Sequence, residues 1–260
     1  MLIGFLETHP SNEPISMKIL LLDIETSPNV AHVWGLFKQN ISISQIIDSS
    51  YVMCWAAKWL GQDTMLFGSV RQGRKNMLKR VYKLLEEADA VVHYNGSRFD
   101  VPTLNKEFLL QGWTPPSSFQ QIDLLKTARN KFKFPSNKLD YVAKALKVGG
   151  KTAHAGHQLW VDCLAGKQEA WSSMEEYNKN DVTLLEKVYW KLLPWIKGHP
   201  NHGLYDGTTS CPHCASTALV KRGYYYTSTV KYQRVKCSDC GSWSRYKSGT
   251  TVKEGLTSVS

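Results

Sequence analysis

The first long run of aliphatic residues in the chain leads directly into two acids. Residues 18–25 read KILLLDIE, so Ile19–Leu22 are followed at once by Asp23, Ile24 and Glu25. A short apolar run of this kind, ended by acids and then by Thr-Ser-Pro, predicts a β-strand buried on both faces. Because successive side chains of a strand point to opposite faces, Asp23 and Glu25 should share one face.

These neighbouring carboxylates have two interpretations. They could form an exposed acidic turn after a core strand. They could also form half of a divalent-metal site, because two buried carboxylates repel each other unless a cation lies between them. The second interpretation requires further acids elsewhere in the chain.

The segment that follows predicts the antiparallel part of a mixed sheet. Its apolar and β-branched residues fall into short runs, and residues 61–63, Gly-Gln-Asp, are typical of a hairpin turn between the last two. The predicted strands are His32–Phe37, Ile41–Ile47, Tyr51–Trp59 and Thr64–Phe67.

From residue 74 onwards the pattern alternates between helix and strand. A helical apolar stripe covers Arg74–Ala88, a strand follows at Ala90–His93, and a turn at 94–97 leads to a helix opened by Asp100 and Pro102. This alternation is typical of an α/β fold. A short strand over Gln121–Leu124 and a short helix over Leu139–Leu146 come next.

Three further polar positions have competing explanations. Asp100 could be the N-cap of its helix, or it could be the third acid of a metal site. Asp123, at the end of a predicted strand, is another candidate acid. Asn95 and Phe99 could line a substrate groove, although a turn residue and a core aromatic explain them equally well.

Lys126–Pro135, KTARNKFKFP, interleaves four basic residues with two phenylalanines. Such a mixture suits a single nucleic-acid strand, with cations for phosphates and rings for bases. A solvated loop with anchoring aromatics is the alternative.

Trp171–Leu193 is the longest helical pattern, with capping-box spacing at its start and Pro194 at its end. Tyr177 and Asp181 lie four residues apart on its apolar stripe. Burying an ionised carboxylate is costly without a partner, so an acid in this position favours metal coordination. The alternative is a peripheral Asp at the edge of the stripe.

Near the C-terminus, two CxxC pairs are separated by 22 residues. Four cysteines with this spacing predict a tetrahedral structural zinc site, whereas a redox dithiol pair is the weaker alternative. Two strands of a hairpin, Ala218–Thr227 and Val230–Lys236, are predicted between them, as in a zinc ribbon. The expected zinc ligands are Cys211, Cys214, Cys237 and Cys240.

Composition adds a basic balance and excludes a membrane span. The net charge is +10, and residues 201–260 hold eight Lys or Arg against three Asp or Glu, so the C-terminal part is the more basic. A basic balance favours nucleic acid as a partner. No stretch approaches the ~20 apolar residues of a membrane helix, and the start does not read as a signal peptide. With Cys54 and Cys163 expected as buried hydrophobes, we expect a reduced, cytoplasmic protein.

Three segments together resemble the motifs of the DEDD 3′–5′ exonucleases, which have an RNase H-like fold. They are Asp23-Ile24-Glu25, the segment VVHYNGSRFD ending at Asp100, and Tyr177-x-x-x-Asp181. The stretch from Lys138 to Asp181 is similar to ribonuclease H-like exonucleases encoded by bacteria and tailed phages. Position 176 is Glu176 and not the histidine of the DEDDh branch, so Tyr177 resembles the tyrosine of the DEDDy branch.

The resemblance implies a hydrolase that removes nucleotides from 3′ ends. Asp23, Glu25, Asp100 and Asp181 would hold two Mg²⁺ or Mn²⁺ ions about 4 Å apart, and Tyr177 would orient the attacking water. DNA, as single-stranded 3′ ends, is the expected substrate on family analogy. A replication or repair protein is a further candidate partner, and the compartment would be the host cytoplasm if a phage encodes the chain.

The expected fold is therefore an α/β RNase H-like mixed sheet flanked by helices, with a small zinc ribbon that helps to bind nucleic acid. Two other functions stay open: a non-catalytic nucleic-acid-binding or recruitment protein on a nuclease scaffold, and a ribonuclease or endonuclease on the same fold. The expected organisation is an N-terminal extension over 1–16, an exonuclease domain over 17–195, a linker over 196–209, a zinc ribbon over 210–247 and a disordered tail over 248–260.

Overall fold

A five-stranded mixed sheet forms the centre of the larger part of the protein. The computed structural model describes residues 17–151, 156–251 and 255–256, so the expected extension over 1–16 lies outside the described residues. The strand order is β5-β4-β1-β6-β7. β1 pairs antiparallel with β4 and parallel with β6, β4 pairs antiparallel with β5, and β6 pairs parallel with β7. The strands are β1 Ile19–Thr26, β4 Val52–Trp59, β5 Met65–Ser69, β6 Ala90–His93 and β7 Gln120–Asp123.

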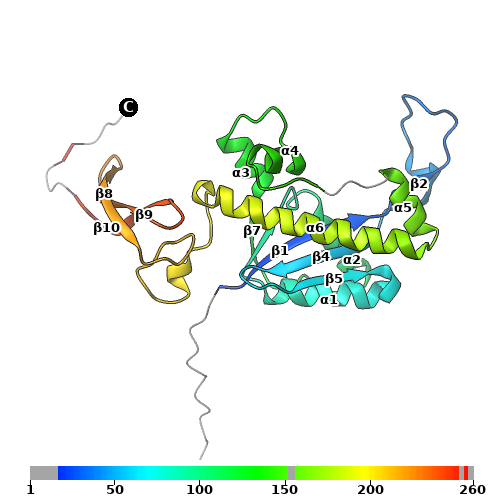
Figure 1. Ribbon diagram of the computed structural model, residues 1–260, viewed down its shortest axis with the longest axis horizontal. Helices are drawn as coiled ribbons and strands as arrows, with labels where there is room; N and C mark the ends of the chain where they lie inside the picture. The colour runs from blue at the N-terminus through cyan, green and yellow to red at the C-terminus, as the bar shows by residue number, and fades with distance from the viewer. Residues whose placement is uncertain (1–16, 152–155, 252–254, 257–260) are drawn as a thin grey trace, which may run out of the picture. The chain divides into compact units, whose positions relative to one another are not determined.

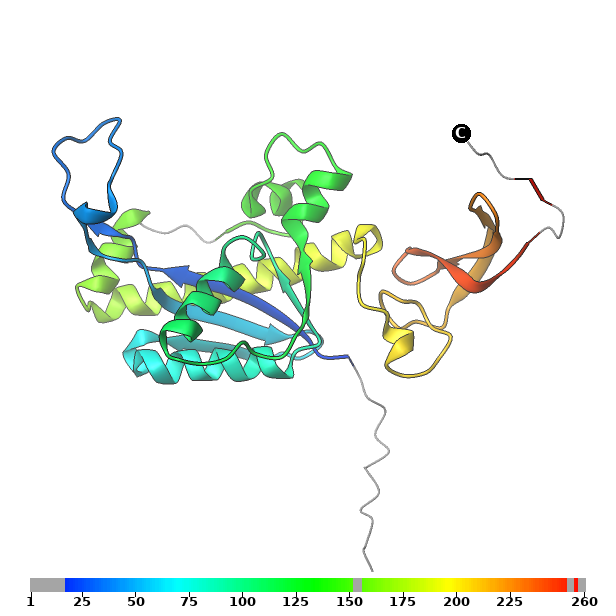
Figure 2. The same cartoon turned by 180° about the vertical axis from the view of Figure 1, so that it is seen from behind.

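Helices cover both faces of this sheet. α6 crosses one face in front of β1 and β4 (Figure 1), whereas α1 and α2 lie on the opposite side, which Figure 2 shows from behind. The α6 side also carries α5. The bounds are α1 Arg74–Glu87, α2 Asp100–Leu110, α3 Leu124–Lys131, α4 Leu139–Ala145, α5 His157–Leu164 and α6 Gln168–Leu192.

The two faces of β1 bury different side chains. Leu20, Leu22 and Ile24 pack in one hydrophobic cluster with buried residues of α1 and α2, such as Leu78 and Leu104. Because the side chains alternate, Asp23 and Glu25 belong to the other face, which α6 covers. The sequence prediction of a central strand with both acids on one side is confirmed.

Residues 30–48 do not form the two long strands that the sequence predicts. β2 is only Val30–Ala31 and β3 is Ile46–Asp48, with a 3-10 helix over Ile43–Gln45 before β3. The strand expected over His32–Phe37 is wrong. The run of apolar residues does not form a strand here because its side chains are not packed into a core. Trp34, Leu36 and Phe37 are all exposed to solvent.

Three helical features also differ from the sequence predictions. Lys126–Lys131 lies in α3, so the first part of the basic and aromatic segment is a helix rather than a loop. α6 begins at Gln168 behind the N-cap Lys167, and the expected capping box at Ser172 is absent because its hydroxyl donates to the Gln168 carbonyl oxygen inside the helix. α5 was not predicted from the sequence.

The chain divides into two compact units, and the first spans Lys18–His199. Ile196, assigned to a linker from the sequence, is buried within this unit. Three short 3-10 helices complete the described elements, namely Val70–Gln72, Leu193–Trp195 and, in the second unit, His202–Leu204.

The second unit, from Pro200 onwards, is built on a three-stranded antiparallel sheet in the order β10-β9-β8. β8 and β9 form the hairpin that the sequence predicts, and β10 is an additional strand. β10 extends past Lys247, where the ribbon was expected to end, because Gly249 and Thr250 still pair with β9. The strands are β8 Leu219–Tyr226, β9 Lys231–Cys237 and β10 Trp243–Thr250.

Across the described ranges of both units, no helix combines the length and the apolar composition needed to cross a membrane.

Candidate functional site

Asp23 and Glu25 lie at the carboxyl end of β1, on the face that α6 covers. Their cross-strand neighbours on β4 are Ala56 and Cys54, two small side chains that leave room above the strand. The β1–β4 register shifts immediately after Glu25, between Glu25 and Thr26. Irregular pairing of this kind ends a regular ladder and redirects the chain next to functional sites.

Asp181 approaches these two acids from α6. It is only 2% exposed. Asp23, Glu25 and Asp181 each offer one carboxylate oxygen, and these atoms all lie within 4.8 Å of one another. Three acids from distant parts of the sequence therefore meet over the end of β1.

Asp100 lies beside this group, although it is not part of the 4.8 Å cluster. It is the first residue of α2, and Phe99 occupies the N-cap position, so the N-cap interpretation of Asp100 is wrong. Instead, the Ile24 backbone N–H donates to the Asp100 Oδ1 atom at 3.2 Å. The buried Asp100 carboxylate is thus fixed to the strand that carries Asp23.

The electrostatics of the cluster call for a positive charge. Burial, followed by repulsion from Asp100, Glu25 and Asp181, raises the pKa of Asp23. Burial and repulsion from Asp181 raise the pKa of Glu25 to about 8, and burial raises the pKa of Asp100 to about 7. Without a cation, the raised pKa of Glu25 favours its protonated form at neutral pH, whereas a divalent ion favours the ionised carboxylates.

A lysine that the sequence analysis did not select supplies part of this charge. The Lys151 Nζ atom forms a short ion pair with Asp181 Oδ2 and donates to the Tyr177 hydroxyl at 3.0 Å. Burial opposes the charged form of Lys151, but Asp181 and these hydrogen bonds hold its pKa above the ordinary range. No sequence motif marks this residue, since its place depends on the fold.

Tyr177 lies one turn before Asp181 on the same side of α6, as its spacing predicts. Its ring packs edge-on against Trp160 with centroids 6.1 Å apart. Burial and the charge of Asp181 raise the pKa of Tyr177 to about 12. The phenol is therefore protonated in the neutral range and can donate a hydrogen bond.

Asn178, a second residue missed from the sequence, positions Asp23. It is fully buried on α6, and its Nδ2 atom donates to the Asp23 Oδ2 atom at 2.7 Å. The bond holds one oxygen of Asp23 toward the helix. An asparagine beside Tyr177 on the buried face was the signal that could have identified it.

Asp123 is not brought into the acid cluster as a ligand. It is the N-cap of α3, and its Oδ1 atom accepts from the backbone N–H groups of Leu125 and Asn95, each at 3.0 Å. Its Oδ2 atom accepts from the Ser97 hydroxyl at 2.6 Å. Although burial opposes ionisation, these bonds hold its pKa below the usual range, so Asp123 ties the 94–97 turn to α3.

Of the two groove candidates, Asn95 fits its structural explanation and Phe99 does not. Asn95 is a turn residue with a positive φ of 73°, a conformation that asparagine tolerates. Phe99 is 44% exposed, so it is not a core aromatic.

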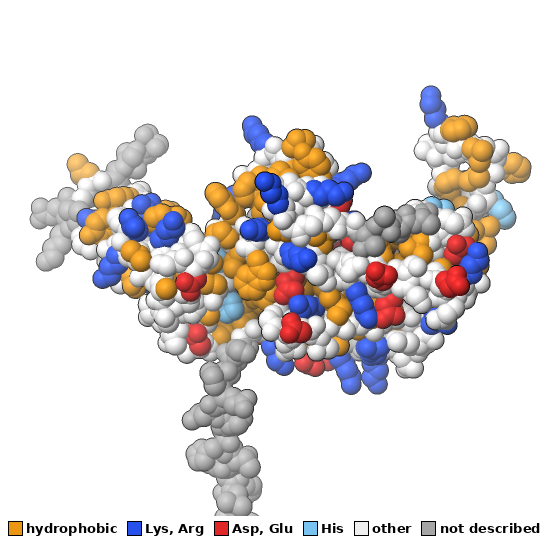
Figure 3. All heavy atoms as spheres, viewed as in Figure 1, with side chains coloured by type: hydrophobic (Ala, Val, Ile, Leu, Met, Phe, Trp, Pro, Cys, Tyr) orange, Lys and Arg blue, Asp and Glu red, His pale blue; other side chains and the backbone are white. Residues whose placement is uncertain are grey.

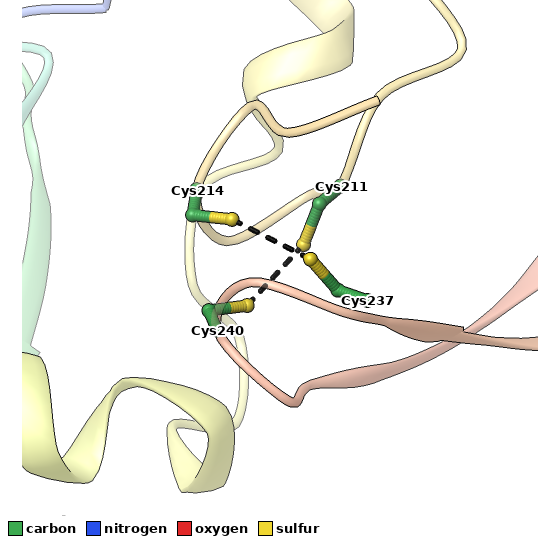
Figure 4. A group of neighbouring side chains, drawn as sticks. All are labelled: Cys211, Cys214, Cys237 and Cys240. Carbon is green, nitrogen blue, oxygen red and sulfur yellow. Dashed lines mark hydrogen bonds between the residues drawn. The ribbon is translucent and has the colours of Figure 1, made fainter. Parts of the chain in front are cut away.

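The four cysteines of the second unit converge as their spacing predicts, and Figure 4 shows their sulfur atoms pointing toward one another. Sγ of Cys211 lies 3.6 Å from that of Cys240, and Sγ of Cys214 lies 3.7 Å from that of Cys237. A tetrahedron with metal–sulfur bonds of about 2.3 Å has edges of about 3.8 Å, so the four sulfurs fit one metal ion. The Ser242 hydroxyl lies 3.2 Å from the Cys211 sulfur.

Comparisons with known proteins agree with this fold. A family model described as the RNase_H superfamily matches residues 55–193, a range that includes Asp100, Tyr177 and Asp181 but begins after β1. No curated protein matches the chain. Among solved structures, the chain is similar to the family B DNA polymerase from the hyperthermophilic archaeon Pyrobaculum calidifontis, with a TM-score of 0.50 and 18% identity.

That similarity covers 68% of this chain and 25% of the polymerase chain, so it spans a quarter of the polymerase's length and concerns the fold alone. The family model, by contrast, covers more than half of the chain, including α6 and the buried acid that faces β1. The chain belongs to the RNase_H superfamily.

Proposed function

We propose that the chain is a metal-dependent 3′–5′ exonuclease of the DEDDy type. The observation that carries the proposal is the convergence of Asp23, Glu25 and Asp181, whose oxygens lie within 4.8 Å of one another. Asp100, the first residue of α2, adds a fourth carboxylate that is hydrogen-bonded to the end of β1. Membership of the RNase_H superfamily supports a nuclease built on this fold.

Two Mg²⁺ or Mn²⁺ ions fit this set of ligands. All four candidate side chains are carboxylates, the hard oxygen ligands that these ions prefer. The raised pKa values of Asp23, Glu25 and Asp100 are consistent with a site built for added positive charge. Bound there, such ions stabilise the charge on the attacking and leaving oxygens of an in-line phosphodiester displacement.

The protein's own polar groups position the reactants. The Tyr177 hydroxyl would orient the attacking water by hydrogen bonding, because a phenol with a pKa of about 12 is a poor general base at neutral pH. Asn178 fixes the Asp23 carboxylate. Lys151 reaches both Tyr177 and Asp181, so its ammonium group is placed to hold them and to contact a substrate phosphate.

The DEDDy assignment rests on α6. Position 176 is Glu176, so the chain lacks a histidine at the place where the DEDDh branch has its general base. Tyr177 instead occupies the position four residues before Asp181, on the buried face.

In the second unit, the proposed structural metal is Zn²⁺, held by Cys211, Cys214, Cys237 and Cys240. Cations and aromatic rings alternate on its strands and suit phosphates and bases. The Lys231 Nζ atom lies 3.8 Å from the Tyr224 ring centroid, and the Arg245 guanidinium carbon lies 3.7 Å from that of Tyr232. We propose that this ribbon assists nucleic-acid binding, with DNA as the favoured substrate.

The test uses 5′-labelled single-stranded DNA and RNA of one sequence, each incubated with the full chain and Mg²⁺. We expect stepwise shortening of the DNA from its 3′ end. Asp181→Asn should reduce the rate by about 10³-fold or more, since the loss of a metal ligand removes several kcal/mol of transition-state stabilisation. Asp162→Asn, at a half-buried acid of α5 that pairs with Lys167, is the matched control and should retain the wild-type rate.

Each alternative has its own outcome in this experiment. Retardation of the DNA without shortening would favour the non-catalytic binding protein. Internal cuts would indicate an endonuclease, and shortening of RNA alone would indicate a ribonuclease. Undiminished rates in a folded Asp181→Asn protein would refute the acid cluster as the active site.

A further inference from the structure

A second pocket of the first unit lies on the far side of α3 from the acids. The acid-side pocket, of about 600 Å³, includes Asp23, and α3 contributes Leu125 and Arg129 to it. The second pocket, of about 580 Å³, is lined by Lys126, Thr127, Asn130 and Lys131 of the same helix. Since an α-helix is about 10 Å across, the two pockets lie roughly one helix diameter apart.

The second pocket is rich in cations that are not committed to acids. Lys126 and Lys131 of α3 and Lys197, beyond α6, are all exposed and line it. Among the residues that the structure describes, none of these three forms an ion pair. The single acid of the lining, Asp123, is buried and engaged by the hydrogen bonds described above.

A cluster of three aromatic side chains lies beside these lysines. Trp195 lines the pocket and is 52% exposed. Its ring is braced by Phe132 in an edge-on contact with centroids 5.3 Å apart, and Phe132 in turn contacts Phe134 at 5.5 Å. A half-exposed indole with a braced edge loses little conformational freedom when a flat ligand stacks on it. Figure 3 shows Lys and Arg side chains interspersed with hydrophobic ones over α3, α4 and the end of α6.

We infer that this pocket binds single-stranded nucleic acid upstream of the 3′ end, as a second contact site for the substrate. The inference rests on the proposed function for the placement of the 3′ end at the acids. The lysines that form no ion pair can bind backbone phosphates, and the Trp195 ring can stack on an unpaired base. A strand that runs from Asp23 past Arg129 crosses α3 to reach Lys131 and Lys197. The pocket suits a nucleotide better than an acidic peptide, because its lining combines lysines for a phosphate with an exposed aromatic ring for a base.

The first experiment measures binding of fluorescent single-stranded DNA of about 4 and about 20 nucleotides by the full chain, without added divalent ions. Trp195→Ala and the double variant Lys131→Glu/Lys197→Glu should each weaken binding of the long strand about 10-fold and leave the short one unchanged. The double variant should also lower the slope of log affinity against log salt by about 0.7 for each lost phosphate contact. Lys75→Glu/Lys79→Glu, on exposed positions of α1, is the charge-matched control and should keep the wild-type length dependence.

The outcomes separate this inference from the proposed function. If the wild-type chain binds DNA with this length dependence but cleaves none, the proposed exonuclease fails and the second site stands. Wild-type affinity of the variants for the long strand, in proteins that keep their melting temperature, would overturn the inference. An equal loss for both lengths would overturn it as well. Binding of fluorescent polyglutamate is measured alongside the DNA; if the double variant loses polyglutamate binding and keeps wild-type DNA binding, the pocket belongs to an acidic protein and the inference is overturned.

Discussion

The two clusters of metal-ligand residues lie in very different surroundings. The acids stand on a five-stranded sheet whose β1 buries Leu20, Leu22 and Ile24 in a large hydrophobic cluster. In the part of the second unit that the structure describes, the buried hydrophobic residues are Cys211, Val235 and Cys237, two of which are proposed ligands. The first unit therefore has a large hydrophobic core, whereas the described part of the second unit has almost no hydrophobic core.

This difference indicates what each metal does. A unit of about 60 residues with few buried apolar groups gains too little from burial to fold alone, so its metal contributes folding energy directly. The acid cluster costs stability without a cation, because its carboxylates are buried close together. We therefore expect a metal at the cysteine site to stabilise the fold of the second unit and metals at the acid site to serve catalysis.

The largest expected effect is the loss of the ribbon when its metal is lost. Cys237→Ser should unfold the second unit, since binding of a structural zinc contributes about 10 kcal/mol or more. Two-dimensional NMR should show collapse of the signals of residues 210–250, with the signals of the first unit unchanged. Cys163→Ser, at a buried cysteine of α5, is the control and should leave the zinc content at the wild-type level. Retention of ribbon signals in metal-free Cys237→Ser protein would remove the distinction between the two clusters.

A smaller effect is expected from a change that leaves the acids intact. Tyr177→Phe removes only the hydroxyl, so packing against Trp160 remains while the attacking water loses its partner. Single-turnover rates with Mg²⁺ should fall about 10²-fold, as for other positioned acid–base groups. Tyr189→Phe, on the same helix but hydrogen-bonded to His199, should retain the rate. An unchanged rate for Tyr177→Phe would assign the phenol to packing alone.

The smallest effect is on stability and depends on pH. Glu25 and Asp100 have pKa values of about 8 and about 7 in the folded state, above those of an unfolded chain. The metal-free folded state therefore binds more protons, and its stability should fall as pH rises from about 5 to about 9. Each kcal/mol of stability lost would lower the melting temperature of the first unit by about 2–4 °C.

Scanning calorimetry in magnesium-free buffer checks this trend, and Mn²⁺ should reverse it most strongly at the alkaline end. Glu25→Gln removes one of the raised carboxyl groups, so it should flatten the pH profile. A metal-free profile that rises over the same interval would contradict the electrostatic description of the cluster.

Short-range patterns in the sequence predicted most of the first unit. β1, β4, β6 and α1 were predicted almost residue by residue, because the strands are short apolar runs buried on both faces and α1 has a buried stripe with the helical period. The same reasoning placed Asp23 and Glu25 near the end of β1, Asp100 at the start of α2 and Asp181 on the buried face of α6. The strand predicted over residues 32–37 is wrong because the apolar side chains there are exposed, and the periodicity of a sequence does not show whether a side chain is buried.

The contacts of Lys151 and Asn178 could not be predicted in the same way, although the place of Asn178 beside Tyr177 on the buried face of α6 marks it as a candidate. Lys151 reaches Asp181 across 30 residues, and Asn178 reaches Asp23 across 155. Such contacts depend on how α6 crosses β1 and not on any local motif. The pairing of Asp100 with the Ile24 backbone is of the same kind, whereas the N-cap that the sequence suggested is a local contact.

The most direct test of the central claim is anomalous diffraction from crystals of the full chain grown with Mn²⁺. We predict two Mn²⁺ ions about 4 Å apart, bound by the carboxylates of Asp23, Glu25, Asp100 and Asp181. Diffraction that shows these carboxylates intact and without Mn²⁺ at saturating concentration would contradict the proposed active site.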